Sequence, residues 1–215
     1  MVHLLKIKNI LVRVLFLFIF LLILFIAISL VFTLFYPMKY KEYINKYSRE
    51  YDLDPFLVAA IINVESKYNK NATSHKDARG LMQIGKQTGQ WASEEFKMED
   101  YNVNILFDPE TNIKMGTWYL DKLNIEFEDN LDLVLAAYNA GSGNVTKWLK
   151  DDKYSKDGKN LHHIPFSETK DYLKKVKFNQ KIYETIYKSY MTDSNKMITL
   201  YFDAINHFRD YLRDV

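Results

Sequence analysis

Residues 54–66 read DPFLVAAIINVES, and this stretch indicates the fold class of the chain. Asp54 and Pro55 form a typical helix start, because an aspartate accepts hydrogen bonds from free backbone N–H groups and a proline fits the first helical turn. Residues 56–64 are apolar on nearly every side, which is typical of a helix buried in the middle of a domain. The sequence therefore predicts a central buried helix that ends near Glu65 and Ser66.

The rest of the chain repeats this helical pattern. Residues 108–110, Asp-Pro-Glu, open a second helix in the same way, and Gly116 on its apolar stripe predicts a close contact with another helix. A third apolar helix over residues 131–138 should stop at Gly141, which can adopt the left-handed conformation of a helix cap. Alternating strand patterns are nearly absent, so we predict an all-α domain. Further helices are expected at residues 145–149 and 172–187, with a polar loop at 150–163 between them.

Length and composition limit the chain to one compact domain beside a membrane segment. It has 215 residues, 48% of them hydrophobic and 26% charged, which suffices for one good core. We therefore expect four parts, which are a basic cytoplasmic stub (1–13), a transmembrane helix (14–36), the main helical domain (37–190) and a C-terminal amphipathic helix (191–215).

Residues 14–36 contain no charge and are rich in Leu, Ile and Phe. A helix of this length can cross about 30 Å of hydrocarbon. A cleaved signal peptide is the alternative, with small residues at 27–29 as its cleavage site. Basic residues flank both ends, so the positive-inside rule does not orient the segment. An activity outside the cell would place the N-terminus in the cytoplasm and the main domain outside.

Charge and residue types argue against several other classes of protein. Beyond residue 36 the chain holds 26 basic and 27 acidic residues, so a broad basic surface for nucleic acid is not expected. The absence of cysteine excludes a lipidated cysteine, a disulfide framework and cysteine-ligated metals. His162 and His163 stand adjacent in a predicted loop without the spacing of zinc ligands, so no metal site is predicted.

Glu65 is the strongest catalytic candidate. It shares an apolar stripe with Val58 and Ile62 at the end of the buried helix, where both the helix dipole and apolar neighbours disfavour a negative charge. We therefore expect a raised pKa, and a carboxyl that stays protonated near neutral pH can act as a general acid. The alternative is a solvated glutamate that Lys67 and Lys70 keep ionised.

Glu65 belongs to the first of three short motifs that follow one another along the sequence. These are Glu65-Ser66, GLMQI at residues 80–84, and AAYNAG at residues 136–141. Together with phrases such as DLDP, NIKMG and IPFSETKDY between residues 51 and 187, they resemble the soluble lytic transglycosylase family, which shares the goose-type lysozyme fold. The resemblance implies a lysozyme-like fold for the main domain. The substrate implied is the glycan strand of bacterial peptidoglycan.

The resemblance also implies roles for single residues. Glu65 would be the sole catalytic acid and base, and Tyr138 would place its hydroxyl near the Glu65 carboxyl. The implied substrate-binding residues are Ser66, Met82, Gln83, Tyr138, Asn139 and Tyr172, with Gln83 bonded to an N-acetyl sugar. Each also has an ordinary structural interpretation, such as core packing for Met82 or a local backbone contact for Ser66. Gly85-Lys86 departs from the family, which commonly has an apolar residue and a proline there, so one wall of the groove differs.

The implied reaction is a cleavage without water that leaves a 1,6-anhydromuramoyl end, and it needs neither metal nor cofactor. Two alternatives remain open from the sequence. One is a muramidase of the same fold that uses water, and the other is a non-catalytic wall-binding or assembly protein. Partners other than peptidoglycan and the membrane are not identified by any residue.

Overall fold

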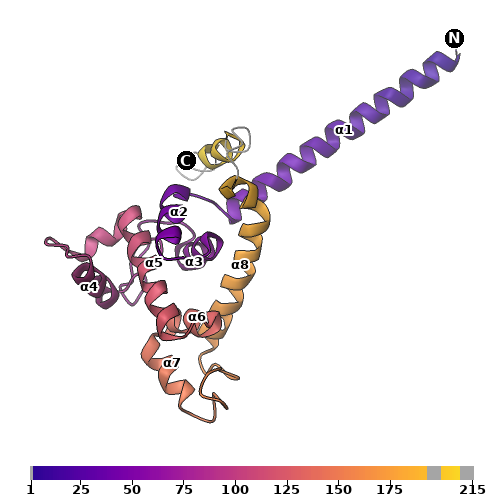
Figure 1. Ribbon diagram of the computed structural model, residues 1–215. Coiled ribbons are helices and arrows are strands. Elements are labelled where there is room, and N and C mark those ends of the chain that lie inside the picture. The colour runs from indigo at the N-terminus through magenta and orange to yellow at the C-terminus, as the bar shows by residue number, and fades with distance from the viewer. Residues whose placement is uncertain (1, 193–199, 209–215) are drawn as a thin grey trace. The chain divides into compact units, whose positions relative to one another are not determined.

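The computed structural model describes residues 2–192 and 200–208, and its regular elements are all helices (Figure 1). The prediction of an all-α fold is confirmed. No β-strand forms within these two ranges, where only isolated bridges such as Thr73–Arg79 occur. The elements are α1 (Val2–Phe35), α2 (Lys41–Glu50), α3 (Pro55–Ser66), α4 (Lys86–Glu95), the short 3-10 helix η1 (Val103–Phe107), α5 (Pro109–Glu126), α6 (Leu131–Ala140), α7 (Ser142–Leu149) and α8 (Ser167–Thr192).

The chain divides into two compact units, Met1–Pro37 with Lys196–Val215, and Met38–Asn195. The second unit, here called the helical domain, contains α2 to α8 and every predicted site residue. Because α8 continues to Thr192, the expected boundary at residue 190 falls inside its last turn. Of the predicted C-terminal helix, residues 200–208 are helical, and its other residues beyond 192 lie outside the described part.

The first helix, α1, contains the predicted membrane segment. It begins at Val2, so residues 2–13, the expected stub, continue the same helix. Its apolar span is Lys8–Phe32, which has a mean hydropathy of 3.4. None of the most apolar part of this span is buried within the protein. This length and composition are sufficient to cross a membrane, and a signal sequence has the same properties.

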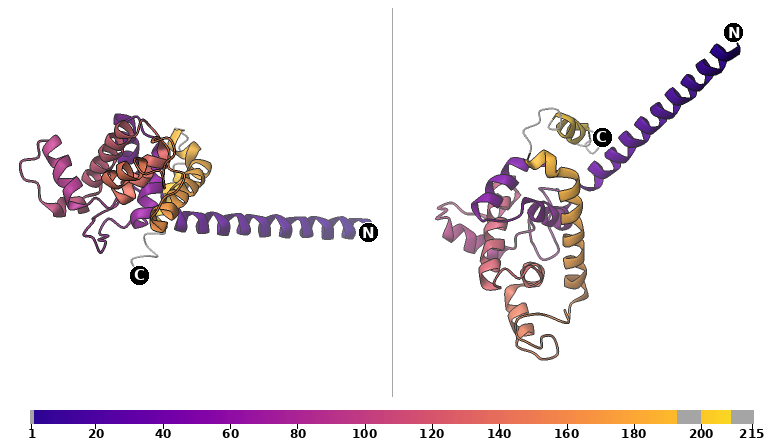
Figure 2. Two further views of the ribbon diagram at one scale, coloured as in Figure 1. Left: turned by 90° about the horizontal axis from the view of Figure 1, so that it is seen from below. Right: turned by 45° about the vertical axis from the view of Figure 1, so that its right-hand side comes forward.

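The central helix α3 is the core of the helical domain. Its residues 56–63 are all buried, and α3 packs along α8, while α5 and α8 run on opposite sides of it (Figures 1 and 2). The Asn63 amide donates a hydrogen bond of 2.9 Å to the hydroxyl of the fully buried Tyr183 on α8. Helix α3 is thereby fixed on all sides, which holds the residues at its C-terminal end in place.

Local chemistry sets both ends of the predicted helices. The Asp54 carboxylate accepts a hydrogen bond of 2.9 Å from Phe56 N, and Asp108 accepts one of 2.9 Å from Thr111 N, so both predicted caps are confirmed. Helix α6 ends before Gly141 as expected, and Gly141 has φ +89°. Its ψ of 138° lies outside the left-handed helical region, because the residue turns the chain directly into α7 instead of closing α6.

Candidate active site

Glu65 lies in the last turn of α3, one residue before the helix ends. The chain leaves α3 through Lys67, whose φ of +51° is left-handed. The Glu65 side chain retains some exposed surface, but it is largely enclosed by protein. Burial accordingly raises the pKa of the Glu65 carboxyl from 4.5 to about 7. The expected pKa shift is confirmed.

Two tyrosines lie close to this carboxyl, Tyr138 from the end of α6 and Tyr172 from the second turn of α8. Burial raises the pKa of both phenols well above 10, and the nearby Glu65 charge adds to each rise. The Tyr172 hydroxyl in turn lowers the pKa of Glu65 by favouring its carboxylate. This hydroxyl is buried and makes no hydrogen bond of good geometry within the described residues, so its contact with Glu65 is a loose one.

The charges around Glu65 do not support a permanently ionised carboxylate. Among the described side chains, no lysine or arginine forms an ion pair with Glu65, so the alternative with Lys67 and Lys70 is not what the structure shows. The charge of the exposed Glu168 at the start of α8 further raises the pKa of Glu65. The sequence did not reveal that a second carboxylate lies this close to the first.

One wall of the site is formed by α6 and the GLMQI segment. The Tyr138 hydroxyl donates a hydrogen bond of 2.8 Å to the Met82 carbonyl oxygen. The Met82 side chain is 0% exposed and packs against Gly116, where an added Cβ would lie 2.3 Å from its sulfur. The close contact expected at Gly116 is therefore made by Met82 and not by a helix. A fully buried side chain has no surface to offer a sugar, so Met82 belongs to the core and not to the substrate-binding residues.

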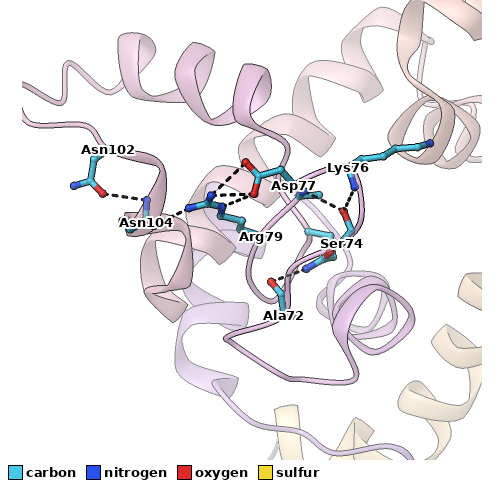
Figure 3. Close-up of polar contacts among 9 residues, drawn as sticks. Ala72, Ser74, Lys76, Asp77, Arg79, Asn102 and Asn104 are labelled. Carbon is cyan, nitrogen blue, oxygen red and sulfur yellow. Dashed lines mark hydrogen bonds and ion pairs between the residues drawn. The ribbon is translucent and has the colours of Figure 1, made fainter.

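Gln83 holds the loop that follows α3. Its side-chain amide N–H groups donate to the carbonyl oxygens of Gly80 and Ala72, at 2.9 and 3.2 Å. In the same loop Arg79 binds Asp77 and reaches Asn104 at 2.7 Å (Figure 3). Because its amide nitrogen is engaged by the backbone, Gln83 has only its amide oxygen left to meet a ligand.

Asn112 on α5 connects the loop to the domain core, which the sequence did not reveal. Its side chain is 0% exposed. The amide oxygen accepts from Met82 N at 2.7 Å, and the amide nitrogen donates to Leu106 O at 2.7 Å and Arg79 O at 2.9 Å. Gly80 packs directly against this amide, because a Cβ at residue 80 would lie 2.2 Å from the Asn112 nitrogen. Its φ of +78° is also one that favours glycine. A polar side chain on the buried face of a predicted helix is the signal that could have identified it.

Ser66 and Asn139 both have partners within the protein. The Ser66 hydroxyl donates to Ile62 O at 3.1 Å, one turn back in α3. The Asn139 amide oxygen accepts a hydrogen bond of 2.7 Å from the buried Thr169 hydroxyl. This second bond joins the end of α6 to the start of α8, so Asn139 and Thr169 set the position of Tyr138 relative to Tyr172.

Two other features lie apart from Glu65. A surface pocket of about 410 Å³ is found near the opposite, N-terminal end of α3, lined by Asn45, Ser48, Arg49, Leu53, Pro55, Phe56 and Met191.

No group of three histidine or acidic side chains that could hold a metal ion occurs in the described part of the chain. His163 instead stacks on Tyr154, with 6.0 Å between ring centroids.

Comparison with known proteins identifies the family. The family model of the transglycosylase SLT domain matches residues 42–161, which is more than half of the chain. The chain belongs to the transglycosylase SLT family. The matched range extends from the second residue of α2 beyond the end of α7, and it contains every predicted site residue except Tyr172.

Similar members of the SLT family include soluble and membrane-bound proteins. The soluble lytic murein transglycosylase of Salmonella typhimurium is 34% identical over 166 residues, covering 76% of this chain and 25% of that protein. The membrane-bound lytic murein transglycosylase C of Shigella sonnei is 32% identical over 170 residues, covering 67% of this chain and 46% of that protein. This SLT chain therefore corresponds to a quarter to a half of these relatives.

A solved SLT structure has the same fold. An inactive glutamate-to-glutamine mutant of the lytic transglycosylase Slt from Pseudomonas aeruginosa superimposes with a TM-score of 0.63 and 30% identity, covering 72% of this chain and 25% of that protein. The resemblance expected from the motifs is confirmed at the level of family and fold. Helix α1 is long and apolar enough to cross a membrane, and the relative from Shigella sonnei is named as membrane-bound.

Proposed function

We propose that this chain is a membrane-anchored lytic transglycosylase that cleaves the β-1,4 bond between N-acetylmuramic acid and N-acetylglucosamine in peptidoglycan. The main support is the Glu65 carboxyl, whose pKa is raised to about 7 and which lies close to Tyr138 and to the buried Tyr172. At neutral pH such a group is divided between its acid and base forms. It can therefore donate a proton and accept one within a single turnover.

The reaction uses Glu65 twice. The protonated carboxyl gives its proton to the oxygen that links the two sugars, and the bond from this oxygen to C1 of the muramic acid breaks. The resulting carboxylate then accepts the proton of the C6 hydroxyl as that oxygen bonds to C1, which gives a 1,6-anhydro end. Because the attacking hydroxyl belongs to the substrate, the closing step gains from proximity and requires no positioned water.

The neighbouring residues support these steps. The Tyr172 hydroxyl faces Glu65 and stabilises its carboxylate form. The free amide oxygen of Gln83 is suited to accept a hydrogen bond from the N–H of an N-acetyl group. We assign Ser66 and Asn139 to shaping the site, since each already bonds within the protein, while Tyr138 fixes the wall through the Met82 carbonyl.

A hydrolytic muramidase is the second candidate, and Glu168 is the observation that favours it. Most glycosidases use two carboxylates, one as acid and one as nucleophile or as base for water. Glu168 is exposed and close enough to raise the pKa of Glu65, so it could activate water. The two reactions give different sugar ends, which makes them separable by product analysis.

Purified sacculi digested with the full-length protein in detergent test the proposal. We expect muropeptides with anhydro ends, which are lighter than reducing ends by one water and are not reduced by borohydride. Reducing ends that disappear in a Glu168→Gln variant would establish the muramidase instead. Binding to sacculi without any released muropeptide would indicate a non-catalytic wall protein.

The anchor gives a topology for this enzyme. We propose that α1 spans the membrane once, with the N-terminus in the cytoplasm and the helical domain outside, because peptidoglycan lies outside the membrane. Its 25-residue apolar span supports this arrangement. A cleaved signal peptide would place the helical domain in the same compartment without the anchor, and the mass of the mature protein from membranes distinguishes the two.

Replacing Tyr172 with phenylalanine should change the pH dependence of cleavage. The acid form of Glu65 starts the reaction, so the wild-type rate should fall as the pH rises through about 7. Without the Tyr172 hydroxyl the pKa of Glu65 rises, and this fall moves to higher pH. We also expect the rate to fall by less than about tenfold, because this loose contact contributes less than a well-formed hydrogen bond to a charged group, which contributes about 1.5–3 kcal/mol. The rate of muropeptide release measured from pH 5 to 9 checks both effects.

Thr185→Val is the matched control, because it removes a hydroxyl from an exposed position of the same helix, where that hydroxyl donates to Lys181 O one turn back. Its pH profile should match that of the wild type. An unshifted profile in Tyr172→Phe would contradict the contact between Tyr172 and Glu65.

A further inference from the structure

A row of aromatic rings leads away from Glu65 along the helical domain. The rings of Tyr138 and Tyr119 lie 5.6 Å apart, and the next ring, Trp91, lies 6.4 Å from Tyr119. Tyr138 belongs to the candidate active site, and Trp91 stands on α4, which packs on α5. The row therefore connects the reacting carboxyl with the outer face of α4.

Trp91 is the exposed end of this row. Its side chain is 47% exposed, although it is one of only three tryptophans in the chain. The ring meets Trp118 at 4.6 Å with an interplanar angle of 70°, and Trp118 is 2% exposed. A buried ring thus supports Trp91 from below and fixes its orientation, while much of the Trp91 surface remains in contact with solvent.

Polar groups accompany the exposed ring. Gln87 lies one turn before Trp91 on the same face of α4, and its side chain is exposed. An oriented aromatic surface beside an amide is suited to a sugar ring, which has apolar C–H faces and polar hydroxyl or acetamido edges. The same helix begins at Lys86, where the sequence departs from the family pattern, so this wall is a feature of this chain.

We propose that Trp91, with Tyr119 beside it, forms a further saccharide subsite, on which a pyranose ring of the glycan strand stacks beyond the two sugars of the cleaved bond while Gln87 binds its polar edge. This inference rests on the proposed function, since it continues the path of the glycan strand away from Glu65. Such a subsite adds binding energy for long strands and none for short fragments. The enzyme would consequently prefer long glycan strands.

Binding of two N-acetylglucosamine oligomers tests the subsite. The full-length protein in detergent carries Glu65→Gln so that no cleavage occurs, and titration calorimetry gives the dissociation constants of the hexamer and the dimer. A second substitution, Trp91→Leu, keeps an apolar side chain against Trp118 but removes the flat ring. We expect it to weaken hexamer binding by about threefold to tenfold, as is typical for aromatic stacking, with dimer binding unchanged.

Two further variants separate stacking from folding. Trp91→Phe retains a flat ring and should restore most of the hexamer affinity. Phe178→Leu removes another exposed ring, 59% exposed on α8, and should have no effect on either oligomer. Thermal unfolding of each variant shows whether the loss of Trp91 acts through stability.

The outcomes distinguish this subsite from the proposed function. If the parent protein and its Trp91→Leu variant bind the hexamer equally well, the subsite is refuted, and this result does not bear on the function of Glu65. Equal weakening of hexamer and dimer also overturns it, because the ring would then act on the central site. Binding of neither oligomer by the parent Glu65→Gln protein would count against a glycan-directed function and thus against the subsite as well.

Discussion

Replacing Glu65 with glutamine should reduce the release of muropeptides from sacculi by about 10²- to 10⁴-fold, the usual contribution of general acid–base catalysis. Glutamine keeps the size and most contacts of the side chain but cannot donate the proton that breaks the sugar bond. Muropeptide release measured by liquid chromatography and mass spectrometry checks the loss. Glu184→Gln, an exposed change in a surface ion pair with Lys188 on α8, is the control and should leave the rate unchanged.

The same variant has a second, thermodynamic effect. The pKa of Glu65 is about 7 in the folded protein against its ordinary value of 4.5, so the folded state binds the proton more tightly than the unfolded state does. The stabilisation from this proton is complete below pH 4.5 and is lost as the pH rises to about 7. On the order of 2–3 kcal/mol of unfolding free energy should disappear over this window in the wild type.

Glu65→Gln carries no titrating group at this position, so its unfolding free energy should fall less over the same pH range. Denaturant unfolding at pH 4.5 and pH 7.5 measures the difference. Full muropeptide release by Glu65→Gln would contradict the catalytic role, whereas identical pH dependence of stability would contradict only the raised pKa.

Replacing Asn112 should have the largest effect on stability. Asn112→Ala removes the side-chain partners of Met82 N and Leu106 O, while Arg79 O keeps its hydrogen bond from Ile84 N. Because each buried polar group left unpaired costs about 1–3 kcal/mol, we expect a loss of about 3–5 kcal/mol in unfolding free energy. Cleavage should fall as well, since the loop that carries Gln83 loses its attachment to α5. Urea unfolding followed by circular dichroism gives the stability.

Asn112→Asp sharpens this test. The aspartate can still accept from Met82 N, but its second oxygen would face two carbonyl oxygens, so the variant should become less stable as the carboxyl ionises with rising pH. Asn104→Ala is the control, because Asn104 binds Arg79 from an exposed position and should cost less than about 1 kcal/mol. Equal stability of the Asn104 and Asn112 variants would refute the role of Asn112.

Local rules explain why much of the fold could be predicted from the sequence. Asp54 with Pro55, and Asp108 with Pro109, fix helix starts through contacts within three residues along the chain. The apolar run of residues 56–64 predicts a buried helix wherever its partners lie. The position of Glu65 at the end of this helix, and its raised pKa, follow from the same two facts.

The details that could not be predicted all depend on contacts between distant segments. Met82, in the loop before α4, was expected in the sugar-facing wall. Its burial depends on Gly116 in helix α5. Two of the three hydrogen bonds of Asn112, those with Met82 N and Arg79 O, and the bond between Thr169 and Asn139 join segments that lie far apart in sequence. Periodicity places such residues on a helix face but does not identify which polar atoms they meet.

The anchoring of the GLMQI loop to α5 has an evolutionary consequence. The hydrogen bonds of Asn112 with Met82 N and Arg79 O fix the position of residues 79–82. Helix α4 takes no part in these two bonds. The segment from Lys86 to Glu95 can therefore diverge among related enzymes while the geometry around the reacting carboxyl is conserved. Substrate preference and catalytic competence should then evolve separately, which makes α4 a suitable segment to exchange when the glycan-length preference of such an enzyme is to be redesigned.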